Sequence, residues 1–157
     1  MIECRPVRPS DLPALADLAR RSWLDAFGSS VSSESAAEEA AARSEAYFAS
    51  ALEESSILVA EVDGALAGYV QFDDQELQRL YVETELHGRG VGRALLTAAL
   101  EHPRLARAPR VHLQVWEENE RAVRLYESVG FRRAGTTSFT IGSGEVVEDL
   151  VMVLERT

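Results

Sequence analysis

The chain has 157 residues, of which 46% are hydrophobic and 27% charged, which fits one domain over residues 1–157 and excludes a disordered tail. All 16 basic residues are arginine, and the absence of lysine excludes a Walker phosphate-binding loop and enzymes that form a Schiff base through a lysine amine. With 26 acidic residues and a net charge of -10, the chain would repel nucleic-acid phosphates, so we expect no nucleic-acid partner.

The N-terminal part is expected to contain one strand and two helices. Residues 2–7 form the expected strand, and apolar residues at helical spacing from Leu12 to Trp23 predict the first helix. The serine-rich segment 28–33 predicts a loop, and a second helix is expected over residues 35–52.

Three strands are expected next, over residues 57–62, 66–72 and 76–82. The first two are joined by Asp63-Gly64, a strong hairpin signal because both residue types tolerate the positive φ angles of a tight turn. The three strands therefore predict an antiparallel meander.

The remaining elements alternate between helix and strand. A helix is expected over residues 91–100, a strand over 111–116 and a helix over 120–129. A closing strand pair is expected over 131–141 and 146–154, around Gly142-Ser143-Gly144. This order predicts a mixed α/β fold with a central sheet of about seven strands and with four helices.

The cellular address is expected to be the cytoplasm. Cys4 is the one cysteine, so an intrachain disulfide is excluded. The first residues lack the apolar run of a signal peptide, and no apolar stretch approaches roughly 18 residues. We therefore expect no membrane partner.

The most informative segment is a glycine-rich turn between the strand at 76–82 and the helix at 91–100. Gly88, Gly90 and Gly92 let the backbone adopt positive φ angles and approach a ligand closely. The first N–H groups of the following helix have no intrahelical partner and lie at the positive end of the helix dipole. Arg89 and Arg93 add positive charge. The turn therefore predicts an anion site suited to a phosphate or pyrophosphate.

Two other interpretations of the turn account for less of the sequence. A dinucleotide-binding fingerprint needs a third glycine, and Arg93 or Leu95 stands in that position for the two possible registers. A tight turn without a ligand explains one glycine, but less readily three at alternate positions beside two arginines.

The turn resembles the signature of the GNAT superfamily of acetyl-CoA-dependent N-acetyltransferases, Gln/Arg-x-x-Gly-x-Gly/Ala. The segment His87-Gly88-Arg89-Gly90-Val91-Gly92 matches it, with His87 in place of the first Gln or Arg. Residues 115–131 resemble the second motif of the family, in which an Asn follows a strand and precedes a helix with Leu-Tyr and then Gly-Phe. The resemblance spans nearly the whole chain.

The resemblance implies how acetyl-CoA would bind. The strands at 80–82 and 111–116 would separate, with the pantetheine of acetyl-CoA between them and the pyrophosphate on the glycine turn. The residues implied to bind the co-substrate are Leu80, Tyr81, Val82, His87, Gly88, Arg89, Gly90, Val91, Gly92, Arg93 and Asn119. An acceptor amine would then attack the thioester directly, without an acyl-enzyme.

Tyr126 occupies the family's position for the general acid that protonates the leaving thiolate. It also shares a helix face with Ala122 and Val129, so a core aromatic residue is the alternative interpretation.

Glu76 is the candidate general base, since some family members carry a catalytic glutamate at this position. Strand alternation predicts that it shares a face with Gln78, Leu80 and Val82. Other members use a glutamate on the next strand, where this chain has Gln114. Further candidates for the base are Asp73, Asp74, His112 and water.

The acceptor pocket is expected to be walled by residues 23–54. Between residues 32 and 56 the chain has six glutamates and a single cation, Arg43, which predicts an acidic pocket. The three histidines and Cys4 show no metal-ligand spacing, so no metal site is expected.

These features predict an acetyl-CoA-dependent N-acetyltransferase that acts on a primary amine, either a small molecule or a peptide N-terminus. The family also includes homodimers. A non-catalytic acyl-CoA-binding module with the same fold is the alternative.

Overall fold

The computed structural model describes residues 1–140, 144 and 146–156, so that two residues of the predicted closing turn, 142 and 143, lie outside the described residues. The strands are β1 (Ile2–Pro6), β2 (Ser56–Val62), β3 (Ala65–Phe72), β4 (Glu76–Val82), β5 (Arg110–Val115), β6 (Arg132–Thr140) and β7 (Val146–Glu155). The α-helices are α1 (Leu12–Phe27), α2 (Ser33–Ala42), α3 (Glu45–Ala51), α4 (Val91–Glu101), α5 (Pro103–Ala106) and α6 (Glu120–Ser128).

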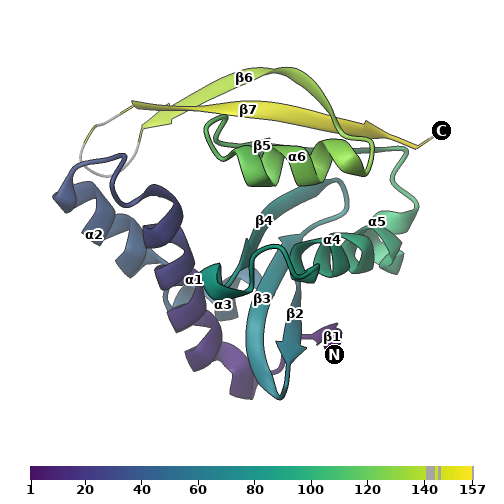
Figure 1. Ribbon diagram of the computed structural model, residues 1–157, viewed down its shortest axis with the longest axis horizontal. Helices are drawn as coiled ribbons and strands as arrows, with labels where there is room; N and C mark the ends of the chain where they lie inside the picture. The colour runs from purple at the N-terminus through teal and green to yellow at the C-terminus, as the bar shows by residue number, and fades with distance from the viewer. Residues whose placement is uncertain (141–143, 145, 157) are drawn as a thin grey trace.

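The strands form one mixed sheet in the order β1-β2-β3-β4-β5-β7-β6. Neighbouring strands are antiparallel except β4 and β5, which are parallel. In Figure 1 the β6–β7 pair crosses the top of the view above β5 and α6, and α1 and α2 lie to the left. The predicted mixed α/β fold with about seven strands is confirmed.

The helix count differs from the prediction, with six α-helices in the described part of the chain in place of four. The helix expected over residues 35–52 is interrupted at Arg43, whose ψ of 63° is not helical, and Ser44 caps a new helix. A further short helix, α5, begins at Pro103, where proline is tolerated in a first turn.

Loss of the Ser44 cap should destabilise the fold modestly. The Ser44 hydroxyl accepts a hydrogen bond from the Tyr47 N–H at 3.0 Å, which satisfies one of the free donors of α3. We expect Ser44→Ala to lower the free energy of unfolding by about 1 kcal/mol, measured by urea titration. Ser29→Ala, at an exposed turn position, is the matched control and should change it by less than about 0.5 kcal/mol. Equal effects of the two variants would contradict the capping role.

The two faces of the sheet pack on different helices. One face carries Leu58, Val70, Phe72, Leu113 and Met152, which form a buried cluster with residues of α4 and α6. The other face carries a smaller cluster, built with α1 and α3. The apolar alternation of each strand explains this division, because successive side chains point to opposite faces.

A β-bulge interrupts the alternation in β4. Gln71 of β3 lies opposite Arg79, but the next residue, Phe72, lies opposite Leu77, so Gln78 is an extra residue on β4. Bulges re-aim the side chains on one side of the extra residue. They also increase the local twist of the strand.

The bulge corrects the predicted face of Glu76. Leu77, rather than Glu76, packs in the same cluster as Leu80 and Val82. Simple alternation from Glu76 to Leu80 fails because Gln78 shifts the period by one residue. Glu76 therefore does not share the face of Leu80 and Val82.

β4 and β5 separate after a short contact. Their ladder consists of Glu76 opposite His112 and Leu77 opposite Leu113, and no later pair is formed among the described residues. The predicted separation of these strands is thus observed. No helix in the described part of the chain is long and apolar enough to span a membrane.

Candidate active site

Two cavities lie side by side where β4 and β5 separate. The smaller, of about 500 Å³, lies against the glycine turn. The larger, of about 1120 Å³, lies between the N-terminal helices and strands β4, β5 and β7. Their shared wall consists of Leu80, Tyr81, Asn119, Ala122 and Tyr126. Ligands that reach this wall from the two cavities would therefore contact the same five residues.

The three glycines of the turn serve two physical purposes. Gly88 and Gly90 have φ angles of +82° and +87°, which side chains other than glycine rarely adopt. Gly92 has an ordinary φ angle, but a Cβ there would lie 3.2 Å from Leu125 Cδ2. The first two glycines shape the turn, and the third lets α4 pack closely against α6.

The start of α4 provides free backbone donors. Gly90 is the N-cap residue, and the first helical bond runs from the Ala94 N–H to the Gly90 carbonyl at 3.0 Å. The N–H groups of the first turn precede this bond and face an N-terminus that favours negative charge. This geometry fits the diphosphate of a nucleotide co-substrate.

The predicted co-substrate residues come together around the smaller cavity, with one exception. Leu80, Tyr81, Val82, His87, Gly88, Gly90, Val91, Gly92, Arg93 and Asn119 line it. Arg89 is exposed and is not part of the lining. Arg121, which the sequence did not single out, lines the cavity from α6.

His87 closes the turn onto the end of β4. Its Nε2 lies 3.1 Å from the Val82 carbonyl oxygen, a bond that the ring donates when the proton is on Nε2. The histidine that replaces the Gln or Arg of the family signature is therefore tied to the protein backbone.

Asn119 begins α6 at the shared wall. Its Oδ1 accepts a long hydrogen bond of 3.4 Å from the Ala122 N–H, which makes it the N-cap residue. Because the oxygen serves the cap, the Nδ2 group is the part of the side chain that can donate to a ligand.

Tyr126 is buried and lines both cavities, with 6% of its surface exposed. Its ring packs against Phe131 at a centroid distance of 5.7 Å. Burial raises the pKa of the phenol, and the nearby Tyr81 raises it further. The phenol therefore stays protonated at neutral pH and can donate a hydrogen bond to a ligand at the shared wall.

Glu76 lines the larger cavity at the point where β4 and β5 still pair. Burial raises the pKa of its carboxyl group, while His112 lowers it and Asp73 raises it. Asp73 is held in place by the N–H groups of Gln75 and Glu76, at 2.9 and 2.8 Å. A carboxyl group with a raised pKa is better matched to accepting a proton near neutral pH than an ordinary one.

A family model described as Acetyltransferase (GNAT) family matches residues 12–131, which include the glycine turn, the separated strands and Tyr126. The chain belongs to the GNAT family. It is therefore an acyltransferase with acetyl-CoA as its co-substrate, which favours an enzyme over the non-catalytic binding module.

Individual GNAT relatives agree with this assignment. An uncharacterized N-acetyltransferase of Mycobacterium tuberculosis is 38% identical over 105 residues, covering 64% of this chain and 67% of the relative. A spermine/spermidine N(1)-acetyltransferase of Bacillus subtilis is 32% identical over 75 residues, covering 47% of this chain and 49% of the relative. The PaiA N-acetyltransferase structure of Thermoplasma acidophilum, solved with coenzyme A, has a TM-score of 0.84 at 23% identity, covering 99% of both chains.

The larger cavity of this GNAT domain is walled by the predicted stretch, since Trp23, Phe27, Arg43 and Tyr47 all line it. The expectation of an acidic wall is only half right. Of the six glutamates between residues 32 and 56, only Glu39 and Glu54 line the cavity, and the single arginine also lines it. The other four, Glu34, Glu38, Glu45 and Glu53, are exposed and do not line the cavity.

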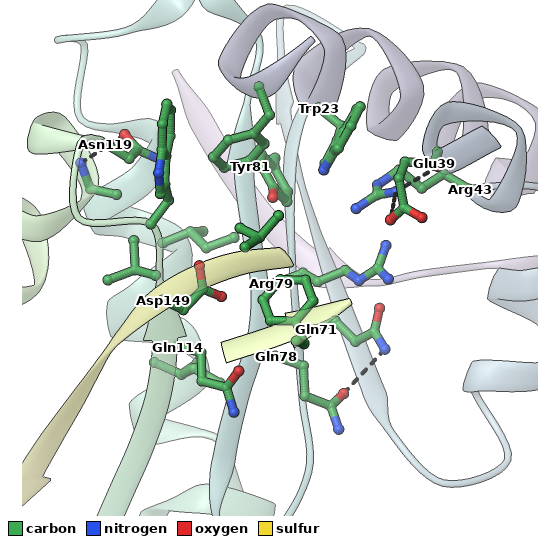
Figure 2. Close-up of a pocket in the computed structure, with 18 of the residues that line it drawn as sticks. Trp23, Glu39, Arg43, Gln71, Gln78, Arg79, Tyr81, Gln114, Asn119 and Asp149 are labelled. Atoms are coloured by element: carbon green, nitrogen blue, oxygen red, sulfur yellow. Dashed lines mark hydrogen bonds and ion pairs between the residues drawn. The ribbon is translucent and has the colours of Figure 1, made fainter. Parts of the chain in front are cut away.

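Among the charged residues of the larger cavity to which the sequence analysis gave no role in the site are Arg43, Arg79 and Asp149. Figure 2 shows Asp149 on the side of the cavity where Asn119 lies, and both arginines on the opposite side. Burial raises the pKa of the Asp149 carboxyl group. Two of them had a weak signal in the sequence, because Arg79 is the single cation of β4 and Arg43 the single cation between residues 32 and 56. Asp149 adjoins Glu148 in β7 and had no distinct signal.

Proposed function

We propose that this GNAT enzyme transfers the acetyl group of acetyl-CoA to a primary amine, with Tyr126 as the general acid and Glu76 as the general base. The whole chain, residues 1–157, would act as one catalytic domain. The free thiol of Cys4 fits a reducing compartment, so we expect the enzyme to act in the cytoplasm.

The shared wall between the two cavities carries the proposal. The smaller cavity offers the anion-binding turn, and the larger one offers room for a second substrate. Tyr81 and Tyr126 belong to both, so a thioester placed along Leu80 would lie within reach of an amine in the larger cavity. Direct transfer between two bound substrates needs this arrangement.

Tyr126 would act on the leaving sulfur. Bound acetyl-CoA supplies an activated acetyl group as a thioester, which a neutral amine attacks with release of the CoA thiol. A phenol with a pKa near 10 is a weaker acid than a thiol near 8.5, so full proton transfer to the thiolate is uphill by about 2 kcal/mol or more. Because burial raises the pKa of Tyr126, a hydrogen bond that stabilises the developing thiolate is its main contribution.

The base must take a proton from the ammonium form of the amine or from the amine during attack. Glu76 and Asp149 both line the larger cavity, and burial raises the pKa of each carboxyl group. Figure 2 shows Asp149 on the side of the cavity where Asn119, a residue of the shared wall, lies. Asp149 is therefore the second candidate for the base.

The pH dependence of the rate should separate the two carboxyl groups. A base works in its deprotonated form, so a raised pKa moves the rising limb of kcat/KM to higher pH than an ordinary carboxyl group gives. We expect Glu76→Gln to remove that limb, and Asp149→Asn, the matched control, to preserve it. The amine substrate contributes a rising limb of its own in every variant, so only the difference between the profiles is assigned to the carboxyl groups.

An unchanged profile in Glu76→Gln together with a lost limb in Asp149→Asn would assign the base to Asp149. The raised pKa also has a consequence for folding, because the folded chain binds the proton more tightly than the unfolded chain. The contribution of Glu76 to stability therefore falls as pH rises from the unfolded pKa through the folded pKa.

Release of CoA thiol with a panel of amines tests the proposed function directly. We expect at least one amine among amino acids, polyamines and short peptides to accelerate thiol release over the rate with acetyl-CoA alone. The background is low because the chain has no lysine, so the N-terminus is its only amine substrate. Thermal stabilisation by acetyl-CoA without acceleration of thiol release by any amine would contradict transfer and support a binding module. The expected stabilisation is measurable, because a ligand at 100 times its Kd adds about 2.7 kcal/mol to the free energy of unfolding.

A further inference from the structure

The side of the larger cavity opposite Asn119 and Asp149 holds two guanidinium groups that come from different elements. Arg43 follows α2, and Arg79 lies on β4 beside the bulge. The Arg43 side chain is 9% exposed. Figure 2 shows both guanidinium groups directed into the same space, below Trp23 and beside Glu39.

Aromatic rings hold the two cations in position without neutralising them. The Arg43 Cζ lies 4.8 Å from the centroid of the Trp23 ring, and the Arg79 Cζ lies 4.6 Å from that of Tyr47. Stacking on a ring fixes the plane of a guanidinium and leaves its edge free to donate hydrogen bonds.

Hydrogen bonding of the pair is incomplete. Arg43 Nη1 donates to the Glu39 carbonyl at 2.6 Å, and the Glu39 carboxylate lies 3.8 Å away, at the limit of an ion pair. Arg79 forms no ion pair among the described residues. Arg43 Nε and Arg79 Nη1 are both buried without a hydrogen-bond partner in the described part of the chain.

A buried cation, Arg43, beside a partly buried one, Arg79, each with an unused buried donor, is unfavourable unless an anion joins them. Burying an unpaired charge or donor costs several kcal/mol, and two like charges add repulsion. Burial lowers the pKa of the Arg43 guanidinium and the charge of Arg79 lowers it further, which indicates that the two groups are close enough to repel each other. A carboxylate between them would accept hydrogen bonds from both.

The rest of the cavity has the opposite sign. Asp149 and Glu76 line it, and Asp149 lies on the side of Asn119, a residue of the shared wall. An ammonium group is therefore favoured on the side of Asp149 and Asn119, and an anion on the opposite side, where Arg43 and Arg79 lie.

We infer that the acceptor of this enzyme is an amine that also carries a carboxylate, with the carboxylate bound between Arg43 and Arg79. This inference rests on the proposed function and names the acceptor class. A phosphate dianion fits less well than a carboxylate, because its second negative charge adds repulsion from the six acidic side chains that line the same cavity. A polyamine fits less well because its second cation would face the two guanidinium groups.

Matched amines that differ by a carboxylate test the inference. The pairs are γ-aminobutyrate and propylamine, phenylalanine and phenethylamine, and leucine and isoamylamine, with spermidine and phosphoethanolamine as further arms. We expect kcat/KM to be roughly 10- to 100-fold higher for the carboxylate member of at least one pair, the range of a charge-assisted hydrogen bond. Equal values in every pair, or a preference for phosphoethanolamine or spermidine, would overturn it.

The Arg79→Met variant tests the residues themselves. Methionine keeps much of the side-chain length, removes the charge and adds no acetylatable amine. The carboxylate preference should fall to about 1-fold, while the KM for acetyl-CoA stays near that of the wild type and the thermal midpoint does not fall. Arg110→Met is the matched control, because Arg110 is an exposed residue at the start of β5 whose ion pair with Glu155 lies outside the cavity, and it should keep the preference. A preference retained in Arg79→Met would overturn the inference.

Calorimetry on the CoA-loaded protein separates this inference from the proposed function. The wild type should bind the carboxylate member of the preferred pair, and Arg79→Met should bind it at least 10-fold more weakly. If no amine is acetylated but this binding pattern is found, the transfer proposal fails and the carboxylate site stands. If none of the aminocarboxylates binds, the carboxylate site fails whether or not other amines are acetylated.

Discussion

The Tyr126→Phe variant is expected to lose about 100-fold in kcat and to keep the KM for acetyl-CoA within about twofold. The change removes only the hydroxyl, so the ring still packs against Phe131. A donor that stabilises the leaving thiolate acts in the transition state and adds little to ground-state binding. Steady-state kinetics with a saturating amine measure the effect.

Tyr69→Phe is the matched control for this change. Tyr69 is also buried, its hydroxyl has no hydrogen-bond partner among the described residues, and it lines neither cavity. We expect kcat of this variant to stay near that of the wild type. Full turnover in Tyr126→Phe would contradict the acid role, and equal losses in both variants would point to a general packing effect.

A negative charge at Gly90 should weaken acetyl-CoA binding strongly. Asp and Asn both tolerate the left-handed conformation of Gly90, at φ +87°, and nothing lies within 4 Å of a Cβ at that position. The two side chains have nearly the same size, so Gly90→Asp and Gly90→Asn differ mainly in charge. A carboxylate about 4 Å from a phosphate is repelled by between about 1 and 4 kcal/mol, depending on the dielectric.

We expect Gly90→Asp to bind acetyl-CoA roughly 30-fold more weakly than Gly90→Asn, which corresponds to about 2 kcal/mol. Titration calorimetry measures both affinities, and thermal unfolding without ligand checks that the two variants are equally stable. The difference should shrink with added salt, because the turn is exposed and its charges are screened. Equal affinities of the two variants would place the diphosphate elsewhere.

Local chemistry explains why the glycine turn could be predicted in detail. The positive φ angles of Gly88 and Gly90 and the free donors of α4 follow from rules that act over a few residues. Asn119 is similar, because an Asn before a helix caps it whatever the rest of the fold does. The second motif, around Tyr126, added a further resemblance to the GNAT family.

Two predictions failed for reasons that can be traced to single residues. Ser44 begins a helix in the middle of a run that favours one long helix, because its cap competes with helix continuation at Arg43. The bulge at Gln78 could not be predicted from the sequence of β4, because an extra residue is recognised only from the pairing of β4 with β3. That single residue changed the expected face of Glu76.

The sequence by itself determined the family, the mixed sheet and the glycine turn before α4, because each depends on short motifs and on the period of apolar residues. Only the tertiary structure decided the character of the larger cavity. Arg43, Arg79 and Asp149 are far apart in the chain and meet there because α2, β4 and β7 converge. A net charge of -10 describes the average surface, whereas the local field depends on which few charges the fold buries together.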